Sequence, residues 1–260
     1  MSRTLYGLLG LPLLTQIGCE QIQDIKDTVE GLTNPLVVAG LHIGVEPPES
    51  SLVNLENTPF ASGASTKIFL ADASDAAHIE ESPVTGGDVG LISDSNGGRF
   101  GLEDQGDGSY TAKGDDGLSY AAEAVLVSVS LDEGDHSIGV AAPAAPQAGI
   151  AETHASGQPM AIDISDQDYD GALVVILDLD GGITWSNQPD TATELYDFTY
   201  GSSDELTQVE VPASAFSGTG RHTVAVAGTR NSTVDQMEEV NTAVSTLIAG
   251  KFRFYPVDVQ

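Results

Sequence analysis

The chain of 260 residues carries 39 acidic and 9 basic side chains, which gives a net charge of −30 at neutral pH. A negative field of this size repels the phosphate backbone, so the composition argues against nucleic-acid binding. Hydrophobic residues make up 40% of the chain, enough for real cores, and no stretch after residue 19 approaches the roughly 18–20 apolar residues of a membrane-spanning helix. The length suits one large or two ordinary domains.

The acidic excess has three interpretations. Acidic surfaces favour solubility. They also suit a saline habitat, because salt screens the repulsion between like charges. A dedicated cation-binding surface is the third interpretation, and we favour the saline habitat.

The first eighteen residues have the pattern of an export signal. Arg3 supplies a positive charge, and six leucines between Leu5 and Leu14 dominate an apolar stretch of about ten residues. This stretch fits a signal peptide and is too short to span a membrane as a helix. We therefore expect residues 1–18 to be removed on export, which leaves 8 basic and 39 acidic residues and a net charge of −31.

Cys19 directly follows this segment and is the only cysteine in the chain. An unpaired cysteine is unusual in an exported protein, because thiols there normally form disulfides. Residues 15–19 resemble the lipobox of bacterial lipoproteins, in which a small residue precedes a cysteine that becomes lipidated and N-terminal. Gly18 and Cys19 match that pattern, whereas Gln16 and Ile17 depart from it. The resemblance implies a lipid on Cys19 and a membrane anchor through it; a plain cleaved signal peptide is the alternative.

Residues 19–35 are expected to form a short helical tether. Apolar residues recur there at spacings of three and four, which places them on one face of a helix: Ile22, Ile25, Val29 and Leu32. Asn34 and Pro35 end the pattern.

From Leu36 onward the pattern changes to short strands separated by Gly, Asp, Asn and Pro. Residues 124–131 alternate between two sets of side chains, as in a strand with one buried face. Several strands at this spacing predict a β-sandwich or barrel, and we assign a β-sandwich domain to residues 36–142. The expected strands are 36–45, 65–71, 89–93, 99–102, 109–112, 122–131 and 137–142.

Ala, Pro, Gly and Ser dominate the next segment without any period, so we expect an interdomain linker over residues 143–158. A second sandwich is expected over residues 159–260, with residues 233–247 forming a short helix or a crossing loop. Its expected strands are 160–164, 172–179, 183–186, 195–199, 208–211, 222–227 and 251–259. The predicted fold class is all-β, with two tandem sandwich domains.

One segment of the first half carries a fold signature. Asp107-Gly108 precedes Tyr110, and Tyr120 and an alternating strand at 125–129 follow. Asp-Gly permits a turn with positive φ, and a tyrosine near a corner buries its ring while its hydroxyl satisfies a backbone group. This arrangement resembles the immunoglobulin-like repeats of bacterial envelope proteins and of filamin-type domains. The resemblance implies immunoglobulin-like sandwiches and no chemistry.

A loop in the second half is the best candidate for a metal site. Asp166, Asp168 and Asp170 alternate before a glycine, and Asp163 lies close by. A tight loop of this kind can point several carboxylates at Ca²⁺. The full calcium-loop pattern requires a Glu at its twelfth position, where this chain has Leu177. An acidic loop between two strands is the alternative interpretation.

The sequence shows no catalytic motif. Its five histidines are scattered without zinc-ligand spacing; they are His42, His78, His136, His154 and His222. The sequence motifs of a catalytic nucleophile, of a zinc protease and of a phosphate-binding loop are absent. The single tryptophan, Trp185, is interpreted as a core or half-core residue of a sandwich rather than a binding platform. We therefore expect a protein that is not an enzyme.

Together these observations predict a non-enzymatic lipoprotein of the bacterial cell envelope with a structural or adhesive role. Its lipid would hold it at the outer membrane or cell surface, and its partner would be another envelope protein or a polysaccharide. The alternatives are a surface module that binds Ca²⁺ or carbohydrate and an envelope hydrolase.

Overall fold

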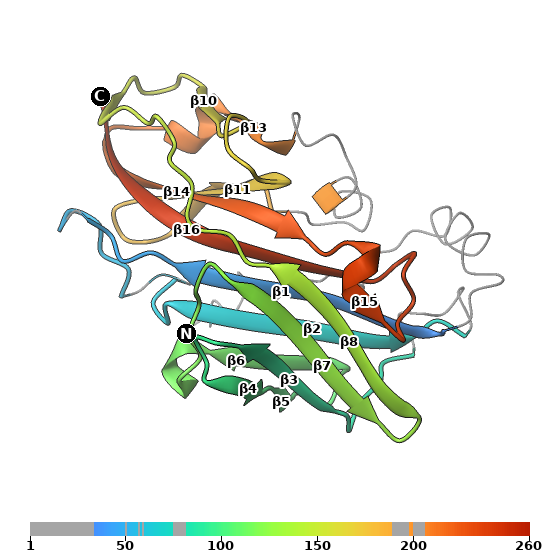
Figure 1. Ribbon diagram of the computed structural model, residues 1–260. Coiled ribbons are helices and arrows are strands. Elements are labelled where there is room, and N and C mark those ends of the chain that lie inside the picture. Colours follow the sequence, from blue (N-terminus) through green and yellow to red (C-terminus); the bar gives the residue numbers. More distant parts are fainter. Residues whose placement is uncertain are drawn as a thin grey trace.

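The computed structural model describes residues 34–49, 51–56, 58, 60–74, 82–188, 198–199 and 206–260. The expected signal peptide, Cys19 and nearly all of the tether lie outside these residues. Strands joined by turns and short 3-10 helices build the described part (Figure 1), so the all-β prediction is confirmed. No helix within it is long and apolar enough to cross a membrane.

The largest element of the described structure is a nine-stranded sheet with the order β12-β11-β14-β16-β1-β2-β6-β5, in which β9 also pairs with β16. These strands are β1 (Leu36–Val45), β2 (Ala64–Asp72), β5 (Glu103–Asp104), β6 (Ser109–Lys113), β9 (Thr153–His154), β11 (Gly171–Leu177), β12 (Ile183–Ser186), β14 (Gly220–Asn231) and β16 (Thr246–Val259). Strands from both halves of the chain therefore belong to one sheet.

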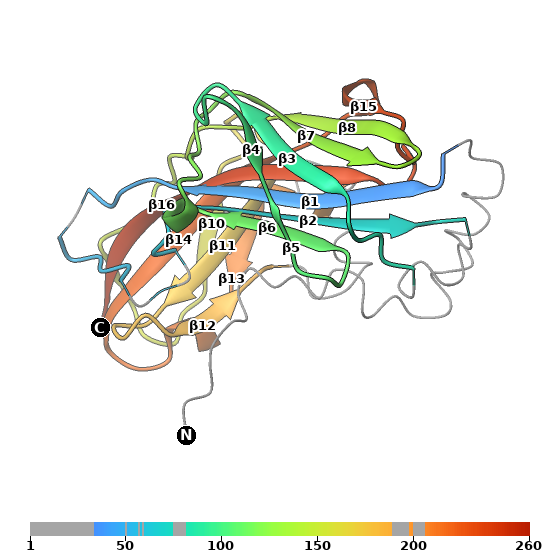
Figure 2. The ribbon, with the colours of Figure 1, turned by 90° about the horizontal axis from the view of Figure 1, so that it is seen from below.

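Two smaller sheets lie against this large sheet (Figure 2). The five-stranded sheet contains β3 (Asp88–Ser93), β4 (Gly98–Gly101), β7 (Ala124–Leu131), β8 (Gly134–Ala141) and β15 (Met237–Glu238), and the two-stranded sheet contains β10 (Met160–Asp163) and β13 (Gln208–Val211). Between strands of the described residues lie the 3-10 helices η2 (Gly114–Asp116), η3 (Ala213–Phe216) and η4 (Val234–Gln236).

The first described strand pairs in parallel with the last. The β1–β16 register runs from Ala39 opposite Thr246 to Val45 opposite Phe252. Strand β16 then continues past the end of β1 and pairs with β14 up to Val259. The two halves that the sequence divides at 143–158 are thus linked through β16 as well as through that segment. The division into two domains stays a prediction.

Two hydrophobic cores lie on one face of the large sheet. On β16, Leu247 and Ala249 belong to the first core, and Val257 and Val259 belong to the second. These positions are all odd-numbered, and alternate side chains of a strand point to the same face. On this face of β16, the side chains between Ala249 and Val257 are polar, and they separate the two cores.

The first core lies between the five-stranded sheet and strands β16, β1, β2 and β6, and we call this part the first lobe. Its largest buried side chains come from both layers: Ile68, Leu70, Leu91, Tyr110, Ile138 and Leu247. The second core lies between strands β11, β14 and β16 and a cover made of β10, β13 and η3, and we call this part the second lobe. Its largest buried side chains are Ile164, Ile176 and Phe216.

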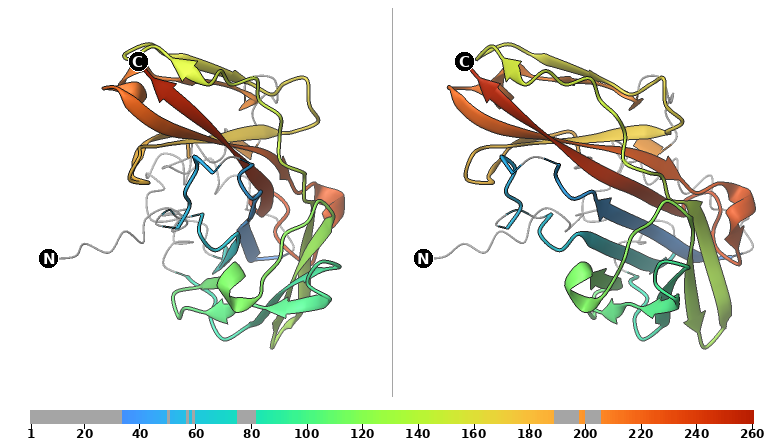
Figure 3. Two further views of the ribbon diagram at one scale, coloured as in Figure 1. Left: turned by 90° about the vertical axis from the view of Figure 1, so that its left-hand side faces the viewer. Right: turned by 60° about the vertical axis from the view of Figure 1, so that its left-hand side comes forward.

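A third core occupies the opposite face of the large sheet. Strand β11 is buried along its whole length, because Val174 and Ile176 face the second core while Val175 and Leu177 face the third. The loop after β1, at residues 46–63, covers this third core with Val53 and Phe60. Figure 3 shows this loop between the two lobes.

Candidate functional site

The predicted metal loop connects β10 to β11, and its carboxylates have separate partners. Asp163 Oδ1 accepts hydrogen bonds from the hydroxyl and the backbone N–H of Ser165, at 2.6 and 2.9 Å, and these bonds hold the Asp163 pKa below its usual range. Asp170 Oδ2 accepts the backbone N–H of Asn231 in β14 at 2.8 Å.

The remaining two carboxylates of that loop also have separate partners. Asp168 forms an ion pair with Arg230 of β14, and Asp166 accepts a long hydrogen bond from the Gln167 amide at 3.4 Å. No three Asp, Glu, His or Cys side chains of the described residues are arranged to hold a metal ion. Each of these aspartates instead has its own protein partner, and calcium binding by Asp163, Asp166, Asp168 and Asp170 stays a prediction.

The immunoglobulin-like signature has the geometry that its residues predict. Gly106 and Gly108 have φ angles of 80° and 82°. The ring of Tyr110 is fully buried, and its hydroxyl donates to the Val84 carbonyl at 3.2 Å while accepting the Gly87 N–H at 3.1 Å. The expected backbone-satisfying role of this tyrosine is confirmed.

A row of polar side chains lies between the first and second cores, and we call it the seam: His42, Glu46, Tyr120, Tyr169, Lys251, Arg253 and Tyr255. On β16, Lys251, Arg253 and Tyr255 occupy the same face as the core residues on either side. Arg253 contacts both carboxylate oxygens of Glu46, at 2.5 and 3.0 Å. The Arg253 guanidinium holds the Glu46 pKa below its usual range.

His42 and Tyr120 form the first-lobe end of the seam. Their rings stack with centroids 4.7 Å apart, and His42 Nδ1 lies 2.7 Å from the Thr66 hydroxyl. Burial lowers the His42 pKa to about 4, although the charge of Glu123 opposes this shift. His42 is therefore neutral at pH 7. Burial also raises the pKa of Tyr120, whose ring centroid lies 5.9 Å from the Lys251 ammonium.

Three tyrosines of the seam hold the segment that the sequence predicts to be a linker. We call residues 143–148 the strap. Tyr120 donates to the Pro143 carbonyl at 2.9 Å, Tyr169 to the Ala144 carbonyl at 3.1 Å, and Tyr255 to the Pro146 carbonyl at 3.2 Å. The sequence carries no signal for this contact, because the tyrosines lie far apart along the chain and the strap has no periodicity.

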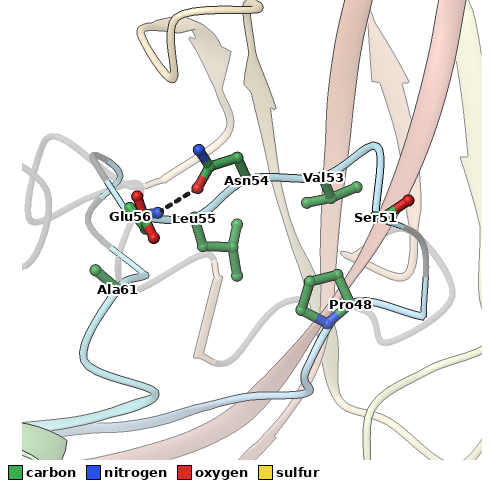
Figure 4. A pocket seen from close by; sticks show the side chains of 7 residues that line it. All are labelled: Pro48, Ser51, Val53, Asn54, Leu55, Glu56 and Ala61. Atoms are coloured by element: carbon green, nitrogen blue, oxygen red, sulfur yellow. Dashed lines mark hydrogen bonds between the residues drawn. The ribbon is translucent and has the colours of Figure 1, made fainter.

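A surface pocket of about 400 Å³ lies in the loop that covers the third core (Figure 4). Pro48, Val53 and Leu55 supply apolar walls, and Glu56 carries the charge. The loop is shaped locally by Asn54, whose side-chain oxygen accepts the Glu56 N–H at 2.9 Å. Most of the lining residues are exposed, so the pocket suits a shallow surface contact.

Trp185 lies on strand β12, half-buried and packed against the second core. This placement agrees with its interpretation as a core residue.

Comparisons with known proteins found no match in sequence and only distant similarity to solved structures. No protein-family model matches it, and no curated protein matches it. The FN1–FN3 domains of chicken CNTN1 are 11% identical, with 87% of this chain and 69% of that chain covered and a TM-score of 0.26. The fibronectin(III)-like modules of Clostridium thermocellum CbhA are 10% identical, with 85% and 93% covered and a TM-score of 0.19.

A bacterial ice-binding adhesin of 1.5 MDa is also similar, at 11% identity, with 88% of this chain and 67% of that chain covered and a TM-score of 0.22. These neighbours are FN domains, fibronectin(III)-like modules and a bacterial adhesin. Superpositions with such low TM-scores carry no argument about function, and the all-β class rests on the sheets of the chain itself.

Proposed function

We propose that this protein is an exported, lipid-anchored module of the bacterial cell envelope with a structural or adhesive role and no catalytic activity. The observation that carries the proposal is the parallel pairing of β1 with β16. Strand β1 begins two residues after Asn34, where the tether from Cys19 would arrive, and β16 ends at Val259. The anchored end of the fold is thus joined directly to its last strand.

Parallel pairing makes this junction resistant to pulling. In a parallel pair, the start of one strand and the end of the other lie at opposite ends of the ladder. A force between residue 35 and residue 260 therefore runs along the strands and loads the β1–β16 hydrogen bonds together. Such a junction suits a protein that transmits force from a membrane anchor.

Pulling single molecules in two geometries tests the mechanical part of the proposal. Handles at residues 35 and 260 load β1 and β16 in shear. Handles at Gly220 and Val259, which are register partners in the antiparallel β14–β16 pair, open that pair one hydrogen bond at a time. We expect the first geometry to need a several-fold higher unfolding force. Equal forces would contradict a load-bearing role.

The anchor is tested separately by Cys19→Ser followed by cell fractionation. We expect the variant to leave the membrane fraction and mass spectrometry to find lipid only on the wild-type protein. A wild-type protein without lipid, and a variant that stays with the membranes, would contradict the lipoprotein assignment.

A saline habitat completes the proposal. With 39 acidic side chains, the folded chain repels itself at low ionic strength, and the Debye length falls from about 30 Å at 0.01 M to about 3 Å at 1 M salt. The melting temperature is expected to rise with NaCl over this range. A flat or falling curve would contradict the saline interpretation.

A further inference from the structure

The sequence of the strap favours an extended backbone that can bind to a site elsewhere in the protein. Its sequence begins Pro143-Ala-Ala-Pro146-Gln147, and these residues belong to no helix or strand. Each proline fixes its φ near −65°, and Pro-x-x-Pro segments favour a polyproline II conformation whose backbone groups stay open to outside partners. Its carbonyls are therefore available to other groups.

Those carbonyls meet three tyrosine hydroxyls from three separate parts of the chain. Tyr120 precedes β7, Tyr169 precedes β11, and Tyr255 lies on β16. They reach the carbonyls of Pro143, Ala144 and Pro146 in the same order as these residues follow along the strap.

The C-terminal end of the strap, at Gln147 and Ala148, makes further hydrogen bonds. The Tyr255 hydroxyl also accepts the Ala148 N–H at 2.9 Å. Gln167 exchanges two hydrogen bonds with Gln147: its amide donates to the Gln147 carbonyl at 2.8 Å, and its side-chain oxygen accepts the Gln147 N–H at 2.9 Å. Backbone groups of the strap make all of these bonds.

Two glycines make room for the tyrosine rings. A Cβ on Gly44 of β1 would lie 2.3 Å from Cγ of Tyr120, and a Cβ on Gly228 of β14 would lie 2.4 Å from Cδ1 of Tyr169. Both distances are far below van der Waals contact. Each ring therefore occupies space that is open only because the residue beneath it is a glycine, which has no side chain. The tyrosines are thus built into the sheet.

We propose that Tyr120, Tyr169 and Tyr255 form a binding site for Pro-x-x-Pro backbone, which the chain occupies with its own strap. Aromatic side chains that bind a preformed polyproline II segment are a recurring mode of peptide recognition. Because the hydroxyls contact carbonyls, the site selects a backbone conformation rather than particular side chains. Tyr120 lies in the first half of the chain and Tyr169 and Tyr255 in the second, so the bound strap closes a clasp across the seam.

Binding in trans tests this proposal. Residues 143–148 are replaced by a Gly-Ser segment of equal length in the full chain, and the probe is the capped peptide Ala-Pro-Ala-Ala-Pro-Gln. We expect weak, saturable binding to this variant by NMR titration and none to the wild type, whose strap fills the site at high effective concentration. The same peptide with both prolines replaced by alanine should bind less well, because its backbone is less preorganised.

The matched control adds Tyr120→Phe, Tyr169→Phe and Tyr255→Phe, which keep the rings and remove the hydroxyls. Peptide binding should then be lost. A folded strap-replaced protein that shows no peptide binding, or that binds equally well with the three phenylalanines, would overturn the proposal.

Hydrogen exchange in the intact chain keeps the test decisive if the strap-replaced protein does not fold. The Ala148 N–H contacts Tyr255 and no other tyrosine of the site. If the strap binds as one unit, Tyr120→Phe at its opposite end should speed exchange at Ala148 several-fold. Unchanged exchange at Ala148 in Tyr120→Phe would overturn the clasp.

Discussion

The two lobes share strand β16 but are covered in different ways. A five-stranded sheet covers the first core, so its hydrophobic side chains are distributed over long paired strands. The second core is covered by the short strands β10 and β13 and by η3. In a small cover, a few large side chains must bury most of the core. In a full sheet, many side chains on several strands share that burial. One strand therefore supports two cores whose covers differ in the number and length of their strands.

The largest expected effect is that of Phe216→Ala. Phe216 is fully buried in η3 and contacts the rings of His154 and His222, with centroids 4.6 and 5.9 Å away. Its truncation should lower the free energy of unfolding by about 3–5 kcal/mol, measured by urea denaturation. Leu179→Ala, at an exposed hairpin tip, is the control and should change stability by no more than about 0.5 kcal/mol. Equally small effects of both substitutions would contradict the dependence of the second core on Phe216.

Acid should act on the first lobe through His42. The unfolded chain binds a proton at this histidine near pH 6.5, whereas the folded chain does so only near its lowered pKa of about 4. Stability is therefore lost as pH falls from 6.5 to 4, by about 3 kcal/mol in total. His42→Gln should remove this part of the pH dependence of urea unfolding. Parallel stability curves for the variant and the wild type would show that His42 contributes none of it.

Gly44 and Gly228, which lie against Tyr120 and Tyr169, test the two ends of the seam separately. Gly44→Ala and Gly228→Ala both force a tyrosine ring to move, and each should cost about 1–3 kcal/mol in thermal or urea unfolding. Gly44→Ala should cost more, because Tyr120 is also stacked on His42. A larger cost at Gly228 would place the tighter end of the seam in the second lobe.

The smallest effect is expected from the ion pairs. Glu46→Gln removes the charge that Arg253 contacts with two hydrogen bonds in the half-buried seam, and should cost about 1–2 kcal/mol. Asp88→Asn at the outer edge is the control, because Asp88 is 71% exposed; it should cost no more than about 1 kcal/mol.

The pH dependence provides a second readout of the Glu46 pair. The Glu46 pKa is lowered in the fold, so its contribution is present above the ordinary pKa near 4.5 and is lost as pH falls through the folded value. The stability difference between wild type and Glu46→Gln should therefore shrink in acid. A difference that is constant with pH would assign the effect to packing instead of charge.

Local patterns in the sequence predicted much of the secondary structure. Strands 36–45 and 183–186 have the predicted bounds, and the alternating segment 124–131 forms β7. The strand expected at 251–259 is longer and begins at Thr246, because residues 246–250 pair with β1. The local sequence pattern did not predict this pairing. The strand expected at 195–199 lies largely outside the described residues.

Candidate sites were harder to predict. The alternating aspartates predict a shared metal ion, which stays a prediction; in the structure Arg230 and Asn231 of β14 contact two of them. The Pro- and Ala-rich segment predicts an interdomain linker, and nothing in the sequence indicated that tyrosines distant along the chain bind its carbonyls. In both cases the contacting residues are far from the segment in sequence.

The all-β class, the net negative charge and the turn before the buried Tyr110 could be predicted from the sequence alone, whereas export and the lipid on Cys19 stay predictions. These properties follow from composition or from residues close along the chain, where period, turn chemistry and charge act locally. The pairing of β1 with β16, the sheet that both lobes share and the binding of the strap became apparent only in the tertiary structure. Those contacts join residues up to about two hundred positions apart. They form because whole buried faces fit one another, and no short stretch of sequence encodes that fit.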